Sequence, residues 1–448
     1  MKPAARIQTT IDLLGAIEAE TLSLGLPADR VVRNFFRERR FAGSKDRAAI
    51  TGLAYEVLRH KARLMWRVGQ VDGALKTRPR ALVIAALLDL HGLDFSSVFE
   101  HFSGAGYGPV QLDDAEAAMC RALTGPSADA PAMPDWARLD YPDWMDQALR
   151  SRFGPDLEPE LNALNQRAAV DIRVNTLRLS RDKVAGQLRD RGIESDLCPW
   201  SPTGLRVPGR ARVNDLDLFR QGAIEFQDEG AQIASLMCDP RSGMQVVDLC
   251  AGAGGKSLAM AAIMTGKGQL HAFDRETKRL RALEKRLRRA DVRNVQLGGR
   301  PEGGKFEALV GRADRVILDV PCGGSGTWRR NPDLKWRYGV GAIDEFATRQ
   351  RELLDQGARL VKKGGRLIYV TCSVLEQENE EQVRDFLAAN PAFSLIPYQT
   401  VWRDVTGTEA PDSASNMSEC LQLTPCRHGT DGFFIAVLER LDSKTTCH

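Results

Sequence analysis

Apolar residues recur at spacings of three and four through the first quarter of the chain, and few β-branched runs interrupt them. The pattern is clearest at residues 11–26, 46–66 and 80–93. Such a period gathers the apolar side chains on one face of each helix, where neighbouring helices can cover them. The sequence therefore predicts an all-helical domain over residues 1–125.

A stretch rich in Pro, Ala and Ser follows, and its composition predicts a linker over residues 126–139. Beyond the linker, short strand-like runs at 171–175 and 204–207 lie on either side of a charged helical stretch. We interpret residues 140–230 as a small α+β module.

From residue 231 to about residue 442 the pattern alternates between strands and helices. Strand-like runs at 244–250 and 268–274, for example, each lead into a helix. Strands that alternate with helices in this way form a parallel sheet with helices on both faces. The fold class expected for this region is therefore α/β.

Chemically active side chains follow several of the predicted strands, namely Asp248, Asp274, Asp319, Cys322 and Cys372. Ligands of parallel sheets bind at the carboxyl ends of the strands. We therefore expect these side chains to lie at one end of the sheet, around a ligand site.

The glycine-rich turn AGAGGKS connects the first strand of this region to its helix. It is not a phosphate-binding P-loop, because Cys250 stands where that motif requires glycine. An adenosyl cofactor fits better, since glycines let the backbone approach the ligand and the helix N-terminus can face its carboxylate. Asp274 ends the next strand and can accept hydrogen bonds from both ribose hydroxyls. NAD would suit the same geometry, although the spacing is not GxGxxG, and a purely structural turn is the other alternative.

Cys322 and Cys372 are candidate catalytic thiols, because both follow strand ends that face the expected cofactor. The alternative is that each is a small buried hydrophobic residue, which is the ordinary role of a free cysteine. We expect that ordinary role for Cys120, Cys198 and Cys238.

The overall charge of this 448-residue chain is 62 − 59 = +3, which is too small to indicate a polyanionic partner. Basic residues are nevertheless clustered. One cluster lies on the polar faces of the N-terminal helices and comprises Arg33, Arg37, Arg39, Arg40, Lys45, Arg47, Arg59, Lys61 and Arg63. These residues form either a solvated helical surface or a contact surface for nucleic-acid phosphates.

Two further basic clusters fall within the α/β region. Residues 275–300 contain ten basic residues and only three acidic ones. Residues 326–337 interleave Arg and Lys with Trp328 and Trp336, a composition that suits phosphate contact and base stacking. Part of the first cluster must be a solvated helix face, but together the clusters favour a polyanionic substrate.

The nine cysteines show neither a CxxC pair nor a Cys/His spacing typical of zinc sites. This usage predicts reduced thiols in the cytosol and no metal. The first ten residues lack the apolar core of a secretory signal, and the longest apolar stretch, 81–90, is too short to span a bilayer. We therefore expect a cytoplasmic protein without a membrane partner.

Several segments together resemble one family, the RNA (cytosine-5) methyltransferases of the bacterial Sun/RsmB type. The segments that resemble its cofactor loop and its two cysteine motifs are DLCAGAGGKS, DVPCGGSGTWRRNPDLKWR and TCSVLEQENEEQV. RVN at 173–175 and HGTDGFF at 428–434 also match, so the resemblance covers roughly residues 171–440. The helical N-terminal third is similar to the NusB-like RNA-binding domain that such enzymes carry.

The resemblance implies a Rossmann-like class I methyltransferase domain over residues 231–442. It implies methyl transfer from S-adenosylmethionine to C5 of a cytosine in ribosomal RNA, most simply 16S rRNA or a small-subunit precursor. We expect the enzyme to be a monomer. Cys372 is then the nucleophile that adds to C6, and Cys322 assists release of the methylated RNA. The implied cofactor-binding residues are Cys250, Ala251, Gly252, Ala253, Gly254, Gly255, Lys256, Asp274 and Asp319.

One departure from the family pattern concerns the adenine contact. The family commonly has an acidic residue after the third strand, but the corresponding position here is near Gly298, and Glu302 is a possible substitute. Two other functions remain as alternatives: a cytosine-5 methyltransferase of tRNA and an inactive RNA-binding assembly factor. A DNA methyltransferase is disfavoured, because those enzymes carry the nucleophile in the proline-cysteine motif.

Overall fold

The computed structural model describes residues 1–124, 132–209 and 213–442, with residues 22–24 described by their backbone alone. Part of the linker predicted over 126–139 therefore lies outside the described residues, as does Cys447.

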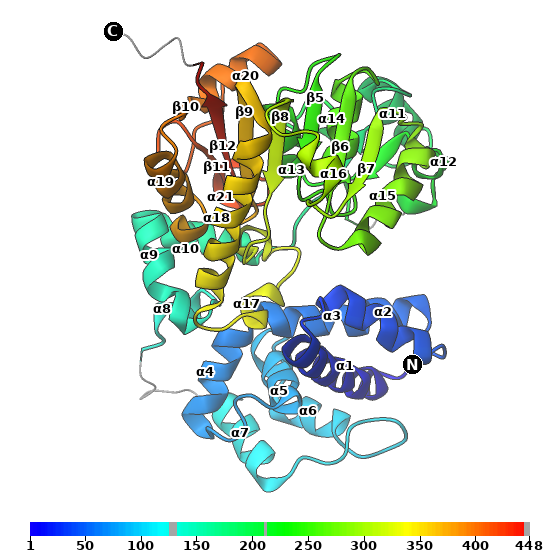
Figure 1. Ribbon diagram of the computed structural model, residues 1–448. Coiled ribbons are helices and arrows are strands. Elements are labelled where there is room, and N and C mark those ends of the chain that lie inside the picture. Colours follow the sequence, from blue (N-terminus) through cyan, green and yellow to red (C-terminus); the bar gives the residue numbers. More distant parts are fainter. Residues whose placement is uncertain (125–131, 210–212, 443–448) are drawn as a thin grey trace. The chain divides into compact units, whose positions relative to one another are not determined.

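Packing divides the chain into two compact units (Figure 1). The first comprises Met1–Gln166 and Trp328–Val340, and the second comprises Arg167–Thr327 and Gly341–His448. The helical unit thus extends beyond residue 139. It also takes up a short segment that the sequence pattern assigns to the α/β region.

The helices of the first unit are α1 (Pro3–Leu24), α2 (Ala28–Glu38), α3 (Ser44–Arg59), α4 (Lys61–Val71), α5 (Pro79–Asp89), α6 (Phe95–His101), α7 (Asp114–Thr124), α8 (Asp135–Arg138), α9 (Asp146–Phe153), α10 (Leu157–Asn165) and α17 (Leu334–Arg337). The stretch 46–66 forms two helices, because His60 leaves the helical backbone and its Nδ1 lies 2.8 Å from Asp140 Oδ2.

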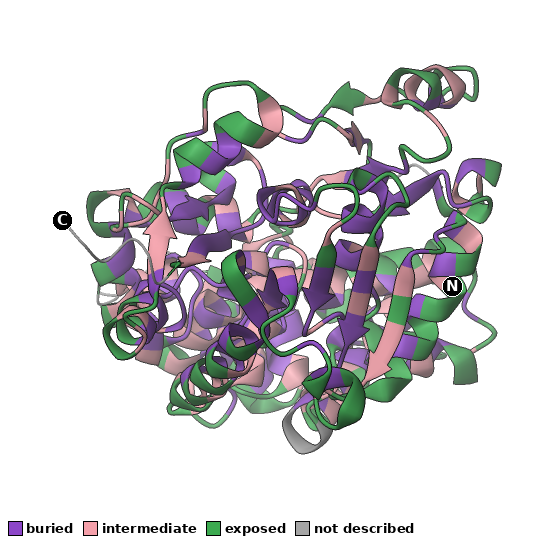
Figure 2. Cartoon of the chain, turned by 45° about the horizontal axis from the view of Figure 1, so that its top comes forward, coloured by how far each residue is buried: buried purple, intermediate pink, exposed green. Residues whose placement is uncertain are grey.

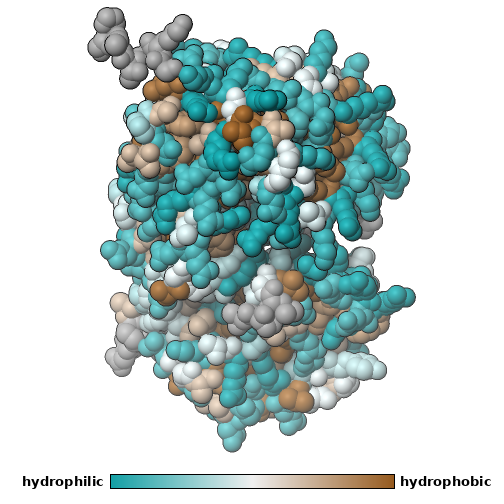
Figure 3. Space-filling model, viewed as in Figure 1, coloured by the Kyte–Doolittle hydropathy of each residue, from teal (hydrophilic) through white to brown (hydrophobic). Residues whose placement is uncertain are grey.

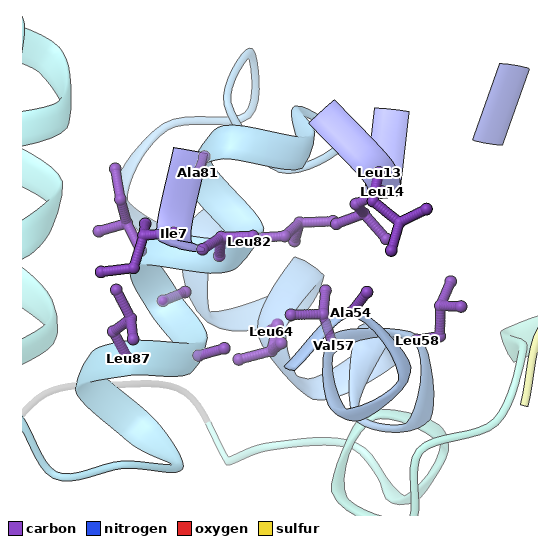
Figure 4. Packing of buried hydrophobic residues seen from close by; sticks show 14 of the residues in the cluster. Ile7, Leu13, Leu14, Ala54, Val57, Leu58, Leu64, Ala81, Leu82 and Leu87 are labelled. Carbon is purple, nitrogen blue, oxygen red and sulfur yellow. The ribbon is translucent and has the colours of Figure 1, made fainter. Parts of the chain in front are cut away.

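Helix α5 is the centre of this unit, because every residue from Ala81 to Leu88 is buried. Figure 4 shows Leu82 of α5 among Leu13 of α1 and Leu64 of α4. A helix that is apolar on all sides needs neighbours on all sides, and α1, α3, α4 and α7 provide them. The all-helical prediction for this region agrees with these elements.

The second unit begins with a small antiparallel sheet in the order β2-β3-β1-β4. Its elements are β1 (Val170–Val174), α11 (Arg181–Arg189), β2 (Asp196–Leu197), β3 (Gly204–Val207), α12 (Asp217–Arg220) and β4 (Ile224–Phe226). Val184 and Leu188 of α11 pack with Ile172 and Leu205 of the sheet. These elements lie within residues 140–230, which the sequence predicts as an α+β module, but residues 140–166 belong to the first unit.

The large sheet of the second unit is mostly parallel, as predicted. Its strands are β5 (Gln245–Asp248), β6 (Gln269–Phe273), β7 (Val295–Gly299), β8 (Ala313–Asp319), β9 (Val361–Thr371), β10 (Phe393–Ile396), β11 (Leu421–Leu423) and β12 (Phe433–Arg440). Their order is β10-β12-β9-β8-β5-β6-β7, with β11 also paired to β12. Strands β5 to β9 pair in parallel, whereas β12 runs antiparallel to β9, β10 and β11.

Helices cover both faces of this sheet (Figure 1). One face packs against α13 (Glu229–Met237), α14 (Gly255–Ile263), α15 (Thr277–Ala290) and α20 (Tyr398–Thr406), and the other against α16 (Gly304–Glu307), α18 (Ala342–Leu360) and α19 (Glu380–Ala389). Successive strand residues point to opposite faces, so Val246 packs on the first face and Val247 on the second. Figure 2 accordingly shows the central strands buried beneath helices whose outer faces are exposed.

The strand order turns around between β5 and β8, because the chain builds outward from β5 through β6 to β7 and then returns to β8. Such a switch point leaves a crevice at the carboxyl ends of the two strands, where ligands of α/β sheets bind. The loops after β5 and β8 carry the glycine turn and Cys322. The fold therefore places the candidate motifs where a ligand is expected.

Among the described residues, no helix combines the length and the apolar composition needed to cross a bilayer. Hydrophilic side chains predominate on the face shown in Figure 3, and the hydrophobic ones form small scattered patches.

Candidate active site

The glycine turn between β5 and α14 has a backbone that only glycine adopts easily. Gly252 and Gly254 have φ angles of 56° and 84°, in the left-handed region. A Cβ atom at Gly254 would lie 2.1 Å from Leu283 Cδ1. The turn therefore fits closely against α15, and it ends where α14 begins at Gly255.

A pocket of about 220 Å³ opens beside this turn. Its lining residues are Gln227, Ala231, Asp248, Cys250, Ala251, Gly252, Ala253, Gly255, Lys256, Arg279 and Asp319. Seven of them belong to the cofactor set expected from the sequence, whereas Gly254 and Asp274 do not line the pocket in the described part of the chain. The motifs gave no signal for Gln227, Ala231 and Arg279, because these residues reach the pocket from other parts of the chain.

Asp274 supports the glycine turn directly. Its Oδ2 accepts a hydrogen bond from the Gly252 N–H at 2.7 Å, and its Oδ1 accepts one from the Glu276 N–H at 2.7 Å. The carboxylate is almost fully buried and also forms an ion pair with Arg279. Asp274 thus connects the end of β6 to the turn that follows β5.

The pocket has a distinctive set of charges. Asp248 is buried, and its burial raises the pKa of this carboxyl to about 7, although the Ser257 hydroxyl donates a hydrogen bond to its Oδ2 at 2.6 Å. The other oxygen, Oδ1, has no hydrogen-bond partner among the described residues. Lys256 Nζ lies 2.7 Å from Asp319 Oδ2 and 5.2 Å from the centre of the Phe433 ring.

These groups fit an adenosyl amino-acid cofactor. The free Asp248 oxygen can accept a hydrogen bond from an ammonium group, and the N-terminus of α14 can face a carboxylate. The left-handed glycines leave space for the backbone to approach the ligand.

The two candidate thiols lie side by side. Cys322 Sγ and Cys372 Sγ are 3.4 Å apart, and both residues are partly buried. They follow β8 and β9, which are adjacent parallel strands with Asp319 paired to Val370. The hydrogen bond with Cys372 is the largest of the effects that raise the pKa of Cys322 well above its usual value, and burial adds to it. Strand pairing therefore brings together two motifs that are distant in sequence.

The two outlying motifs also reach this region. Arg173 Nε donates to Oε1 of Gln227, a pocket residue, at 2.6 Å. The Gly432 N–H donates to the Gly326 carbonyl oxygen at 2.8 Å, and the Gly326 N–H donates to the Cys372 carbonyl oxygen at 2.9 Å. The segment before β12 thus packs against both cysteine loops.

The expectation that the loop 326–337 stacks bases and contacts phosphates is wrong for its central residues. Trp328 and Lys335 are buried within the first unit, and Trp336 Nε1 donates to the Leu58 carbonyl oxygen at 2.7 Å. Asp333 Oδ2 accepts from the Ala28 N–H at the start of α2. This basic and aromatic composition serves packing instead.

The basic helix α15 serves two purposes. Arg286 and Arg289 both pair with the buried Glu225, so they hold the helix against the small sheet. Lys278 and Arg281 are exposed. Apart from Arg286 and Arg289, the basic residues of 275–300 are exposed, so most of the predicted basic surface is available to a polyanion.

Many of the N-terminal basic residues are structural as well. Arg59 Nη1 donates to the Asn165 carbonyl oxygen at 2.8 Å, and Lys61 pairs with Glu18. The exposed members of this cluster are Arg33, Arg37, Arg40 and Lys45, around α2.

The position near Gly298 excludes any side chain with this backbone. A Cβ atom there would lie 2.2 Å from the Phe273 ring. Glu302 is exposed and lies 3.8 Å from Arg300, and it does not line the pocket within the described chain. The missing acidic residue is therefore explained by close packing of Phe273 against β7.

Comparison with known proteins identifies the relatives of this fold and site. The family model described as 16S rRNA methyltransferase RsmB/F matches residues 235–439, and an RsmF/B-like ferredoxin-like domain matches residues 141–214. The second match falls within the predicted α+β module.

The curated relatives have descriptions of the same kind. A probable ribosomal RNA small subunit methyltransferase B of Synechocystis is 34% identical over 307 residues, which cover 68% of this chain and 67% of the relative. The ribosomal RNA small subunit methyltransferase B of Photorhabdus laumondii is 27% identical over 88% of this chain and 91% of its own.

The solved structure of the protein PH0851 is similar over 98% of this chain and 99% of its own, with a TM-score of 0.75 and 27% identity. Together with the sequence relatives, this similarity covers both the fold and the motifs around the pocket. The chain belongs to the RsmB/F family of small-subunit ribosomal RNA methyltransferases, whose methyl donor is S-adenosylmethionine.

Proposed function

We propose that this enzyme methylates C5 of a cytosine in 16S rRNA through a transient bond between Cys372 Sγ and C6 of the base. The observation that carries the proposal is the pair of thiols 3.4 Å apart at the ends of β8 and β9, beside a pocket that fits the methyl donor. Asp319 connects the two features, because it lines the pocket and lies three residues before Cys322.

The chemistry requires a sulfur nucleophile, because C5 of cytosine is itself a poor one. Addition of the Cys372 thiolate to C6 converts the ring into an enamine-like nucleophile at C5. The Cys322 thiol, whose raised pKa keeps it protonated, can donate a hydrogen bond to this thiolate across the 3.4 Å gap. S-adenosylmethionine, when bound, supplies an electrophilic methyl group.

Release of the product requires loss of the C5 proton and cleavage of the bond between Cys372 Sγ and C6. Once Cys372 is bonded to the base, its negative charge no longer opposes ionisation of Cys322, which is then a stronger acid. Cys322 loses its proton to solvent, and its ionised sulfur can then take the C5 proton. The electrons of the C5–H bond re-form the C5–C6 double bond, and Cys372 leaves as a thiolate. This order of steps requires two thiols that lie next to each other.

The cofactor-binding roles follow from the pocket. The turn Cys250–Gly255 would hold the donor through its backbone, with Gly254 shaping the turn and Asp274 supporting it from β6. Lys256 and Asp319 would lie between the donor and the target base, and their ion pair keeps both charges compensated. A base inside a helical stack could not reach this pocket, so the target cytosine must be unstacked.

The first unit is proposed to bind RNA, as the resemblance to NusB-like domains implies. The exposed basic side chains around α2 support this role, since phosphate contacts need accessible cations. We further propose that the enzyme acts as a cytoplasmic monomer on rRNA or a small-subunit precursor. Two free thiols 3.4 Å apart would oxidise easily in an oxidising compartment, which favours the cytosol.

The test uses two cysteine variants and a 16S rRNA transcript or 30S precursor. With the donor present, Cys322→Ala is expected to accumulate a covalent protein–RNA adduct that survives denaturing gels. Cys372→Ala is expected to form neither adduct nor 5-methylcytosine. Methylation retained by Cys372→Ala would overturn the assignment, and a wild-type enzyme that binds rRNA but never methylates it would favour an assembly factor instead.

A further inference from the structure

A single buried carboxylate, that of Glu378, touches both cysteine loops. Glu378 ends the short 3-10 helix Glu376–Glu378 after β9, and its side chain has no exposed surface. Neither the cofactor pocket nor the proposed reaction uses it.

One oxygen of this carboxylate holds the Cys322 loop. Glu378 Oε1 accepts the Gly323 N–H at 2.7 Å, immediately after Cys322. It also accepts from Gln350 Nε2 at 3.2 Å, and the same amide group donates to the Pro321 carbonyl oxygen at 2.9 Å. The residues on both sides of Cys322 are thus held through main-chain atoms.

The other oxygen holds the Cys372 loop. Glu378 Oε2 accepts the Ser373 hydroxyl at 2.6 Å, immediately after Cys372. The Ser373 hydroxyl in turn lies 2.9 Å from the Ser325 hydroxyl, which accepts the Val374 N–H at 2.9 Å. The two serines therefore connect the loops a second time.

Because Glu378 is buried, its carboxylate depends on these hydrogen-bond donors. Desolvation raises the pKa of Glu378, while the hydrogen bonds from Ser373, Gly323 and Gln350 lower it. A buried carboxylate is tolerated only while its donors remain in place. Because Gly323 and Ser373 belong to the two loops, neither loop can move away without removing a donor from the buried carboxylate.

We propose that Glu378 is a positioning residue that sets the separation of the Cys322 and Cys372 sulfurs by binding the residue that follows each cysteine. The proposal deepens the proposed function, on which its catalytic meaning rests. The effect of Glu378 on the separation of the two sulfurs can be measured without a methylation assay.

The geometric test is disulfide formation in the full-length protein with diamide. This diazene takes one hydrogen from each thiol and becomes a hydrazine, while a bond forms between the two sulfurs. Peptide mass spectrometry then follows the cross-linked Cys322 and Cys372 peptides over time. Glu378→Ala is expected to slow this cross-link about tenfold, and Glu378→Gln about threefold, because the amide keeps only one acceptor oxygen.

Glu380→Gln is the matched control. Glu380 is equally buried two residues later, but its Oε1 accepts from Ser415, outside both cysteine loops. Its cross-linking rate is expected to equal that of the wild type. If Glu378→Ala does not fold, Glu378→Gln and Ser373→Ala carry the test, since each removes one part of the same contact.

The catalytic readout is the pattern of kinetic constants. Glu378→Gln is expected to lower kcat about 100-fold with little change in KM for rRNA, because misplaced reacting atoms affect the chemical step. A Glu378→Gln variant with lowered thermal stability but unchanged cross-linking rate and kcat would overturn the proposal. Slowed cross-linking in a protein whose wild type makes no 5-methylcytosine would support the positioning role and refute the proposed function alone.

Discussion

The segment that follows Cys322 divides between the two units. In each unit a buried ionisable side chain holds it, namely Glu378 in the second unit and Lys335 in the first. In the second unit, Glu378 accepts a main-chain N–H and a hydroxyl from the two cysteine loops. In the first unit, Lys335 donates to the carbonyl oxygens of Arg59 and Asp140 at 3.2 and 2.6 Å, and also to a side-chain oxygen. Both side chains are almost completely buried, and each makes three hydrogen bonds.

The difference between them lies in what their partners carry. Two partners of Glu378, Gly323 and Ser373, follow the two cysteines directly, so a shift there would move the sulfurs that we propose to react. The partners of Lys335 belong to α3, α10 and the turn at Asp140, which carry no proposed chemistry. The same physical device, a buried ionisable side chain held by several hydrogen bonds, therefore supports the proposed chemistry in one unit and folding in the other.

The most damaging change should be Gly326→Ala, on the catalytic side of the comparison. The new Cβ atom would lie 2.2 Å from the Gly432 carbonyl oxygen, and backbone cannot yield as a flexible side chain can. We expect adduct formation in a Cys322→Ala background to fall by about 100-fold, with a loss of about 3 kcal/mol in the unfolding free energy of the second unit. Quantified adduct bands and urea unfolding measure the two effects. Unchanged adduct yield would show that the loops do not need this close approach.

Lys335→Met should affect the first unit and spare the thiols. The substitution removes the donor for three buried oxygen atoms, so we expect a loss of about 3 kcal/mol in the unfolding free energy of the helical unit. Hydrogen exchange at the amides of α3 and α10 reports this loss. The diamide cross-link between Cys322 and Cys372 should keep its wild-type rate.

A suitable control is Lys278→Met, because Lys278 is exposed on α15 and its loss should leave the exchange rates of the helical unit unchanged. A slower cross-link in Lys335→Met, on the other hand, would mean that Lys335 also affects the two thiols and that its role does not differ from that of Glu378.

The pH dependence sharpens the same comparison. Burial lowers the pKa of Lys335 to about 7, whereas in the unfolded chain a lysine titrates near 10.4. Between these values the unfolded state binds more protons than the folded state, so stability rises with pH. We expect the helical unit to gain unfolding free energy from pH 7 to pH 10, relative to Lys335→Met. Urea unfolding across this range tests the sign, and a flat or falling difference would contradict it.

The smallest effect is expected for Gly323→Ala. Its Cβ atom would lie 3.1 Å from Ile343 Cδ1 and 3.3 Å from Glu378 Oε2, so each neighbour would have to shift by only a few tenths of an ångström. We expect the diamide cross-link to form twofold to threefold more slowly, which corresponds to a rise of about 0.5 kcal/mol in its activation free energy. The unfolding free energy should stay close to that of the wild type. Cross-linking as slow as in Glu378→Ala would mean that the loop tolerates even less movement than its contacts suggest.

The sequence by itself determined the elements of the α/β region and the motifs at their ends. Apolar residues alternate in strands and recur every three or four residues in helices, and both patterns are local. The elements β5, α14 and α18 could therefore be located without knowledge of their neighbours. Glycine turns and cysteines at strand ends are local too, which is why the turn Cys250–Lys256, all of which except Gly254 lines the pocket, can be predicted from the sequence.

Only the tertiary structure decided which of these residues meet. Strand order brought Cys322 and Cys372 within 3.4 Å, and the close packing of Phe273 excluded a side chain at Gly298. The composition of the loop after Cys322 predicts an RNA surface, but composition does not reveal whether a Trp or Lys will be covered by another part of the chain. Burial and pairing depend on contacts between distant segments, and these contacts also gave Glu378 and Lys335 their separate roles.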